Sequence, residues 1–171
     1  MFNTISRMIH TGILTEPRAL PEATSTADPQ HALWKILGRA LCIRHVDAGS
    51  CNGCELEIHA LNNPYYNLEG TGIKFVASPR HADMLLVTGP VSVNMEEALR
   101  RTYDAMPAPK LVVALGDCGA CGGIFGHTYA SRGSVAQIIP VDHTIPGCPP
   151  APAAILAGIL HAMTTRQAVR D

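Results

Sequence analysis

The chain has 171 residues and a formal net charge of −1, from 13 basic and 14 acidic side chains, and hydrophobic residues make up 47% of it. This length fits one domain with a real core, and a near-neutral charge without a basic run excludes nucleic acid as an expected partner. Six cysteines are too few for a disulfide-rich secreted scaffold, so we expect reduced thiols that are free to bind metal.

The start of the chain mixes Pro, Thr, Ser, Ala and charged residues without a sustained period. We therefore expect residues 1–30 to be an irregular N-terminal extension and residues 31–171 to form a single cluster-binding α/β domain. The first 30 residues show neither a signal-peptide pattern nor a twin-arginine pair, so the chain is expected to stay in the cytoplasm. The most apolar stretch, residues 151–163, has the length of a core helix and is too short to cross a membrane.

Apolar runs and helical segments alternate along the rest of the chain. In chain order they predict a helix at 31–40, a strand at 41–46, a helix at 54–62, strands at 73–77 and 84–88, a helix at 94–105 capped by Asn94, a strand at 110–115, a Gly- and Cys-rich loop, a strand at 137–141, and a helix that runs to residue 163. This alternation predicts a flavodoxin-like, doubly wound parallel sheet with helices on both faces.

Four of the six cysteines follow predicted strands. Cys51 and Cys54 come after the first strand, Cys118 comes after the strand at 110–115, and Cys148 comes after the last strand. Ligands of such sheets gather beyond the carboxyl ends of the strands. Three strand exits are therefore expected to deliver four thiols to one edge of the sheet.

Four thiolates are the ligand set of one 4Fe-4S cluster, and Gly-rich loops let the backbone approach such a group. Glycines stand beside all four cysteines, and Pro149 follows Cys148 much as a proline follows the last cysteine of bacterial ferredoxin runs. The sequence therefore predicts one 4Fe-4S cluster at Cys51, Cys54, Cys118 and Cys148. The two remaining cysteines cannot complete a second cluster of the same kind.

Other uses of the same thiols are open at this point. A zinc site could combine Cys51 and Cys54 with Cys118 and Cys121, although the two pairs are much farther apart than in a zinc ribbon and Cys148 would be left over. Cys118 and Cys121 could also form a redox-active dithiol. Cys121 is otherwise interpreted as a thiol near the cluster that binds no metal. Cys42 is interpreted as a small buried hydrophobe in the first strand.

Four segments together resemble the 4Fe-4S subunit shared by complex I and NiFe hydrogenases: DAGSCNGCE at 47–55, SPRHAD at 78–83, GDC with GGIF at 116–125, and PGCPP at 146–150. The likeness covers residues 40–163 in order. It is greatest to the small subunit of the membrane-associated, energy-converting (group 4) hydrogenases, such as formate hydrogenlyase and hydrogenase-4. Complex I subunits usually carry two adjacent cysteines at the first site, so the C-x-x-C pair here favours a hydrogenase over a quinone reductase.

The resemblance implies a subunit that relays electrons through a single 4Fe-4S cluster and carries no reacting site of its own. The implied partners are a large subunit with a NiFe centre, or its metal-free relative beside a quinone pocket, together with a ferredoxin-like polycluster subunit and membrane subunits. The implied location is peripheral, on the cytoplasmic side of the inner membrane. A complex I-type NADH:quinone oxidoreductase subunit is the alternative.

Three further residues are candidates for tuning the cluster. Glu55 follows Cys54 at the start of a helix, where it is expected to be ionised and either relays protons or caps that helix. Arg80 and His81 stand in a loop that the resemblance places near the cluster, where Arg80 could raise its potential and His81 could couple electron to proton transfer. The alternative for both is an ordinary solvated turn. Asp117 is expected to hydrogen-bond its own loop.

Overall fold

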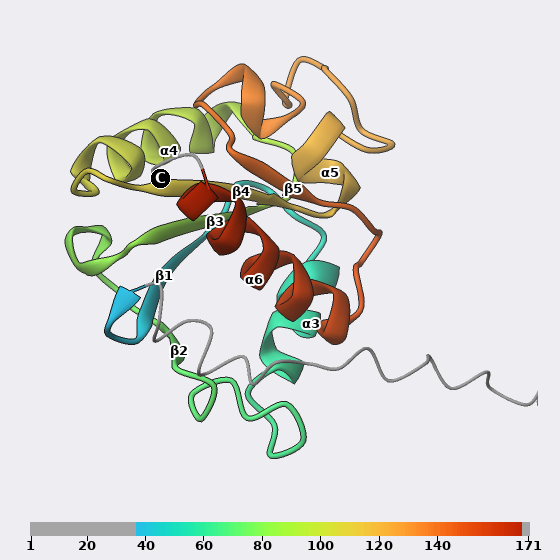
Figure 1. Cartoon of the computed structure of the whole chain (residues 1–171). Helices are drawn as coiled ribbons and strands as arrows, with labels where there is room; N and C mark the ends of the chain where they lie inside the picture. The colour runs from blue at the N-terminus through green and yellow to red at the C-terminus, as the bar shows by residue number, and fades with distance from the viewer. Residues whose placement is uncertain (1–36, 169–171) are drawn as a thin grey trace, which may run out of the picture.

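Five short parallel strands form the centre of the computed structural model, which describes residues 37–168 (Figure 1). The strands are β1 (Leu41–Asp47), β2 (Ile73–Phe75), β3 (Met84–Thr88), β4 (Leu111–Leu115) and β5 (His143–Ile145). They lie side by side in the order β2-β1-β3-β4-β5. This is the order of flavodoxin-like sheets, so the predicted fold class is confirmed.

The two central strands explain why the sequence shows such short apolar runs. Every residue of β3 and of β4 is buried, because helices cover both faces of the sheet. A parallel strand in this position reads as an uninterrupted run of Leu, Val and similar residues rather than as an alternation. The predicted bounds of β3 are correct to the residue.

The sheet separates the core into two layers, and helices cover the layer on each face (Figure 1). On one face, α3 (Gly53–Ala60) and α6 (Pro152–Ala168) contact each other and cover the strands with side chains such as Ile58 and Ile155. On the other face, α4 (Val93–Ala105) buries Leu99 against the sheet. A short helix, α5 (Gly116–Cys121), and two 3-10 turns, η1 (Pro79–His81) and η2 (Val135–Gln137), complete the described elements.

Three details differ from the sequence-based expectations. The last strand was expected at 137–141, but that segment begins at the last residue of η2 and buries Ile139 in the second core. The strand β5 pairs with β4 only from His143 onward. Just before it, the main-chain N–H of Asp142 donates to the carbonyl of Val112, and the carboxylate of Asp142 accepts from the N–H of Val112. The Gly- and Cys-rich loop is the helix α5, and α4 begins at Val93, one residue before the expected cap at Asn94.

The expected N-terminal extension and all but the end of the expected helix at 31–40 lie outside the described residues. None of the helices described is long and apolar enough to cross a membrane.

A glycine after β3 shapes the loop that follows β1. Gly89 has a φ of 76°, and a Cβ added to it would lie 2.5 Å from the main-chain nitrogen of Ser50. The backbones of two strand exits therefore pass closer together than any side chain allows. Gly72 has a similar φ of 82°, but a Cβ added there would meet nothing within 4 Å in the part of the chain described.

Substituting each of these glycines separates the effect of backbone conformation from that of the close approach. Gly72→Ala should lower the free energy of unfolding by about 1 to 2 kcal/mol, the cost of a left-handed alanine. Gly89→Ala should lower it by about 3 kcal/mol or more, because the added methyl must also displace the backbone at Ser50. Urea unfolding followed by circular dichroism measures both. Equal losses in the two variants would contradict the close packing of Gly89 on Ser50.

Candidate functional site

Cysteines from three strand exits define the candidate site. Cys51 follows β1, Cys54 lies in the first turn of α3, Cys118 lies in α5 directly after β4, and Cys148 follows β5. Since all the strands are parallel, their carboxyl ends share one side of the sheet. We call these four residues the cysteine edge. The sheet thus places these four cysteines on one side, as the sequence analysis expected, and their role as ligands stays a prediction.

The four thiols lie near enough to affect one another's ionisation. Burial raises the pKa of Cys54 to about 12, and the carboxylate of Glu55 and the thiols of Cys118, Cys51 and Cys148 contribute to this rise. Burial also raises the pKa of Cys118, with Cys148 and Cys51 as the next contributions. The thiolates of Cys54 and Cys118 are thus destabilised by burial and by their neighbours, so a cationic group is needed to hold these two in the anionic form.

Two glycines leave room for sulfur at this edge. A Cβ added to Gly116 would lie 2.8 Å from Sγ of Cys54, and one added to Gly123 would lie 2.7 Å from Sγ of Cys118. Both glycines have positive φ, at 79° and 54°. Any side chain at these positions would press on a thiol, so the cradle fits a group built on cysteine sulfurs.

The donor set also bears on the kind of metal group. Among residues 37–168, no three His, Cys, Asp or Glu side chains gather closely enough to hold a single metal ion. A 4Fe-4S cluster places its thiolates on separate irons, so its ligands need not converge on one point. The four thiols at this edge equal in number the ligands of such a cluster, and their role as ligands stays a prediction.

The other two cysteines are not among the predicted ligands, although Cys121 lies near enough to contribute to the raised pKa of Cys118. Cys42 is buried within β1, in agreement with its interpretation as a small core residue. Cys121 is exposed at the end of α5, and its thiol donates to the main-chain carbonyl of Asp117 at 3.2 Å.

Asp117 joins two loops that carry cysteines. Its main-chain N–H donates to the carbonyl of Gly147 at 2.9 Å, and its Oδ1 accepts from the N–H of Gly147 at 2.8 Å. The expectation that Asp117 bonds its own loop is therefore wrong. The partner lies 30 residues away, and only the pairing of β4 with β5 brings it there.

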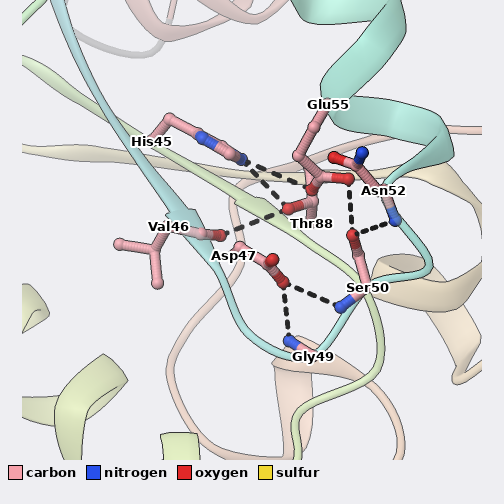
Figure 2. A network of polar contacts seen from close by, with 8 residues as sticks. All are labelled: His45, Val46, Asp47, Gly49, Ser50, Asn52, Glu55 and Thr88. Atoms are coloured by element: carbon pink, nitrogen blue, oxygen red, sulfur yellow. Dashed lines mark hydrogen bonds and ion pairs between the residues drawn. The ribbon is translucent and has the colours of Figure 1, made fainter.

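A polar network fixes the loop between β1 and α3 (Figure 2). Oδ1 of Asp47 accepts hydrogen bonds from the N–H groups of Gly49 and Ser50, both at 2.8 Å. Oγ of Ser50 accepts from the N–H of Asn52 at 3.0 Å and donates to Oε2 of Glu55 at 2.5 Å. The loop that carries Cys51 is therefore held by its own side chains.

The far side of Glu55 faces β1 and β3. Nε2 of His45 lies 3.7 Å from Oε1 of Glu55 and 3.0 Å from Oγ1 of Thr88 (Figure 2). Glu55 is only 7% exposed, and its Oε1 has no hydrogen-bond partner among the described residues. Burial lowers the pKa of His45, although Glu55 and Asp47 oppose this shift. Sequence reasoning missed His45 and Ser50, because no motif links them to Glu55.

The structure does not bring Arg80 and His81 to the cysteine edge. Both are exposed in η1, which leads into the amino end of β3, whereas the cysteines follow the carboxyl ends of their strands. The segment 76–83 connects β2 to β3 at the level of Ile43, and the rest of β1 separates that level from Cys51. Tuning of the cluster by Arg80 or His81 therefore gains no support from this geometry and stays a prediction.

Comparisons of this chain with protein families and with individual proteins point to the same family. A family model described as "NADH ubiquinone oxidoreductase, 20 Kd subunit" matches residues 51–162. The chain is 47% identical over 131 residues to the probable membrane-bound hydrogenase subunit mbhJ of Pyrococcus furiosus, covering 77% of this chain and 78% of that one. It is 45% identical over 139 residues to formate hydrogenlyase subunit 7 of Escherichia coli, covering 81% of this chain and 54% of that one.

A quinone-linked relative and two solved structures extend this likeness. An NADH-quinone oxidoreductase subunit of Desulfovibrio desulfuricans is 42% identical over 146 residues, covering 84% of this chain and 76% of that one. A chain of the archaeal membrane-bound sulfane sulfur reductase aligns with a TM-score of 0.66 and 34% identity, over 81% of this chain and 75% of that one. A chain of an NAD+-reducing [NiFe]-hydrogenase shares the fold, with a TM-score of 0.58 and 20% identity over 74% and 93%. The chain therefore belongs to the NADH ubiquinone oxidoreductase 20 kDa subunit family, whose members include subunits of membrane-bound hydrogenases and of NADH-quinone oxidoreductases.

Proposed function

We propose that the chain binds one 4Fe-4S cluster through Cys51, Cys54, Cys118 and Cys148. We further propose that it relays electrons as the small subunit of a membrane-associated NiFe hydrogenase of the formate hydrogenlyase or hydrogenase-4 type. The main support is the convergence of four thiols from three strand exits on one edge of the sheet. Such a cluster supplies one-electron transfer when it is bound.

The residues of the site hold and tune this group. The four cysteines would bind as thiolates, and Gly116 and Gly123 leave the space that the sulfurs of Cys54 and Cys118 need. Asp117 keeps the loops of Cys118 and Cys148 together. Glu55 places a buried carboxylate directly after Cys54, and a negative charge there lowers the reduction potential because it opposes the arrival of an electron.

A partner must cover the cysteine edge in this proposal. Apolar side chains are exposed close to it in sequence, with Ile124 and Phe125 after α5 at 93% and 48% exposure and Leu56 in α3 at 61%. Exposed apolar groups of this kind mark protein interfaces. We assign this surface to a NiFe-hydrogenase-like large subunit, with a ferredoxin-like polycluster subunit and membrane subunits in the same complex, on the cytoplasmic side of the inner membrane.

A complex I-type quinone reductase subunit is the second candidate. The 42% identity to a subunit of an NADH-quinone oxidoreductase supports it. The C-x-x-C arrangement of Cys51 and Cys54 favours the hydrogenase, because quinone reductase members usually have adjacent cysteines at this point. A zinc-binding interaction module, with Cys121 in place of Cys148, is the third candidate and has no structural support, because no three His, Cys, Asp or Glu side chains among residues 37–168 gather closely enough to hold one ion.

Iron content and electron paramagnetic resonance test the ligand set. We expect about four irons per chain after anaerobic purification, with a reduced-cluster signal in the presence of dithionite. Cys148→Ser should lose that signal, because it removes one thiolate ligand. Cys121→Ser is the matched control, since its exposed thiol lies near the site but outside the ligand set, and it should keep both iron and signal. Zinc without iron, lost in Cys121→Ser and retained in Cys148→Ser, would instead establish the zinc module.

The role of Asp117 can be tested with two variants. Asp117→Ala removes the acceptor for the N–H of Gly147, so the loop of Cys148 should loosen and the cluster should be lost to a chelator about tenfold faster. Asp117→Asn keeps a carbonyl oxygen at the same place and should stay close to the unmodified chain. The decay of the visible absorbance of the cluster gives both rates. Similar rates of cluster loss in Asp117→Ala and the unmodified chain would show that Asp117 does not hold the loops of Cys118 and Cys148 together.

A further inference from the structure

The Ser50 hydroxyl closes a bridge around the two thiols of the first loop. Ser50 directly precedes Cys51, and Glu55 directly follows Cys54. The hydrogen bond from Oγ of Ser50 to Oε2 of Glu55 therefore encloses the whole C-x-x-C segment (Figure 2). The same oxygen accepts the N–H of Asn52, so it also holds the residue between the two thiols.

The backbone beneath this hydroxyl is already fixed. Asp47 accepts the N–H of Ser50, and Gly89 packs so closely that a Cβ on it would lie 2.5 Å from that nitrogen. Asn52 has a left-handed backbone, with φ 70° and ψ 0°, which is uncommon for a residue other than glycine. The hydroxyl of Ser50 thus projects from a rigid support and accepts the N–H of Asn52, the left-handed residue between Cys51 and Cys54.

The carboxylate of Glu55, which accepts this hydrogen bond, lies beside a cavity. Glu55 lines a cavity of about 350 Å³ together with Arg44, His45 and His59. Its second oxygen, Oε1, faces His45 at 3.7 Å, beyond hydrogen-bond distance. Ser50 is therefore the one group among the described residues that holds the carboxylate by a direct hydrogen bond. Without it, Glu55 is free to turn into the cavity.

We propose that Ser50 is a positioning residue of the cluster site, which holds the carboxylate of Glu55 beside Cys54 and keeps the C-x-x-C segment closed. This inference rests on the proposed function. Ser50 acts through Glu55: its hydroxyl sets where the negative charge of Glu55 lies relative to the cluster, and it keeps the segment around Cys54, which is 9% exposed, in one conformation.

A double-mutant comparison with the cluster-loaded chain tests the first part. Glu55→Gln should raise the reduction potential, because a negative charge is removed, and Ser50→Ala should raise it in the same direction, because the charge moves away. Ser50→Ala in the Glu55→Gln background should add no further shift. Ser50→Thr keeps the hydroxyl and should restore the potential of the unmodified chain. An unchanged potential in Ser50→Ala, or an equal shift in both backgrounds, would overturn the link through Glu55.

Thiol labelling of the metal-free chain tests the second part without any cluster. Ser50→Ala should label Cys54 with iodoacetamide about tenfold faster, the effect of one hydrogen bond to a charged group, while Ser50→Thr labels at the original rate. Ser134→Ala is the control, because that serine precedes η2, outside this loop, and makes no capping hydrogen bond there. Labelling of Cys54 at the same rate in Ser50→Ala would overturn the closure of the segment. Absence of iron from the unmodified chain would instead defeat the proposed function and leave this labelling result to stand alone.

Discussion

The site depends on one constraint, the parallel direction of all five strands of the sheet. Parallel strands end on one side, so cysteines placed after β1, β4 and β5 reach the same edge although 97 positions separate Cys51 from Cys148. An antiparallel arrangement would send alternate strand exits to opposite ends. Parallel neighbours must be joined by crossover connections, and the helices in these connections cover both faces of the sheet. The complete burial of β3 and β4 is a consequence of this arrangement.

Side-chain hydrogen bonds then convert three flexible exits into one defined site. Asp117 connects the exits of β4 and β5 through Gly147, and Ser50 connects the two ends of the C-x-x-C segment through Glu55. Ordering loop residues costs conformational entropy, so loops without such partners would hold their thiols loosely. Glycines complete the arrangement where backbone or sulfur approaches too closely for a side chain, as at Gly89 and Gly116.

The fold class and the position of the four thiols on one side of the sheet could be predicted from the sequence, because both depend on local patterns. Buried strands appear as short apolar runs, and the cysteines directly follow them, so the sheet class and the edge follow from general rules of parallel sheets. The last strand was misplaced because Ile138 and Ile139 are apolar for a different reason, namely packing in the second core after a 3-10 turn. The partners of Asp117 and Glu55, and the place of Arg80 relative to the cysteines, depend on contacts between distant segments, which no local pattern contains.

Burial and neighbouring charge make the thiolate forms of Cys54 and Cys118 unfavourable unless a cation compensates. The raised pKa values of Cys54 and Cys118 arise first from burial, and the neighbouring thiols and the carboxylates of Glu55 and Asp117 add to them. A raised folded-state pKa keeps a thiol protonated to higher pH, so binding a cationic group must release these protons. In the proposed function, the binding of a cationic metal group would therefore become more favourable as the pH rises toward the pKa values of these two thiols, and binding would stabilise the folded edge. The burial and the neighbouring charges that destabilise the two thiolates thus favour a group that brings positive charge to the sulfurs of Cys54 and Cys118.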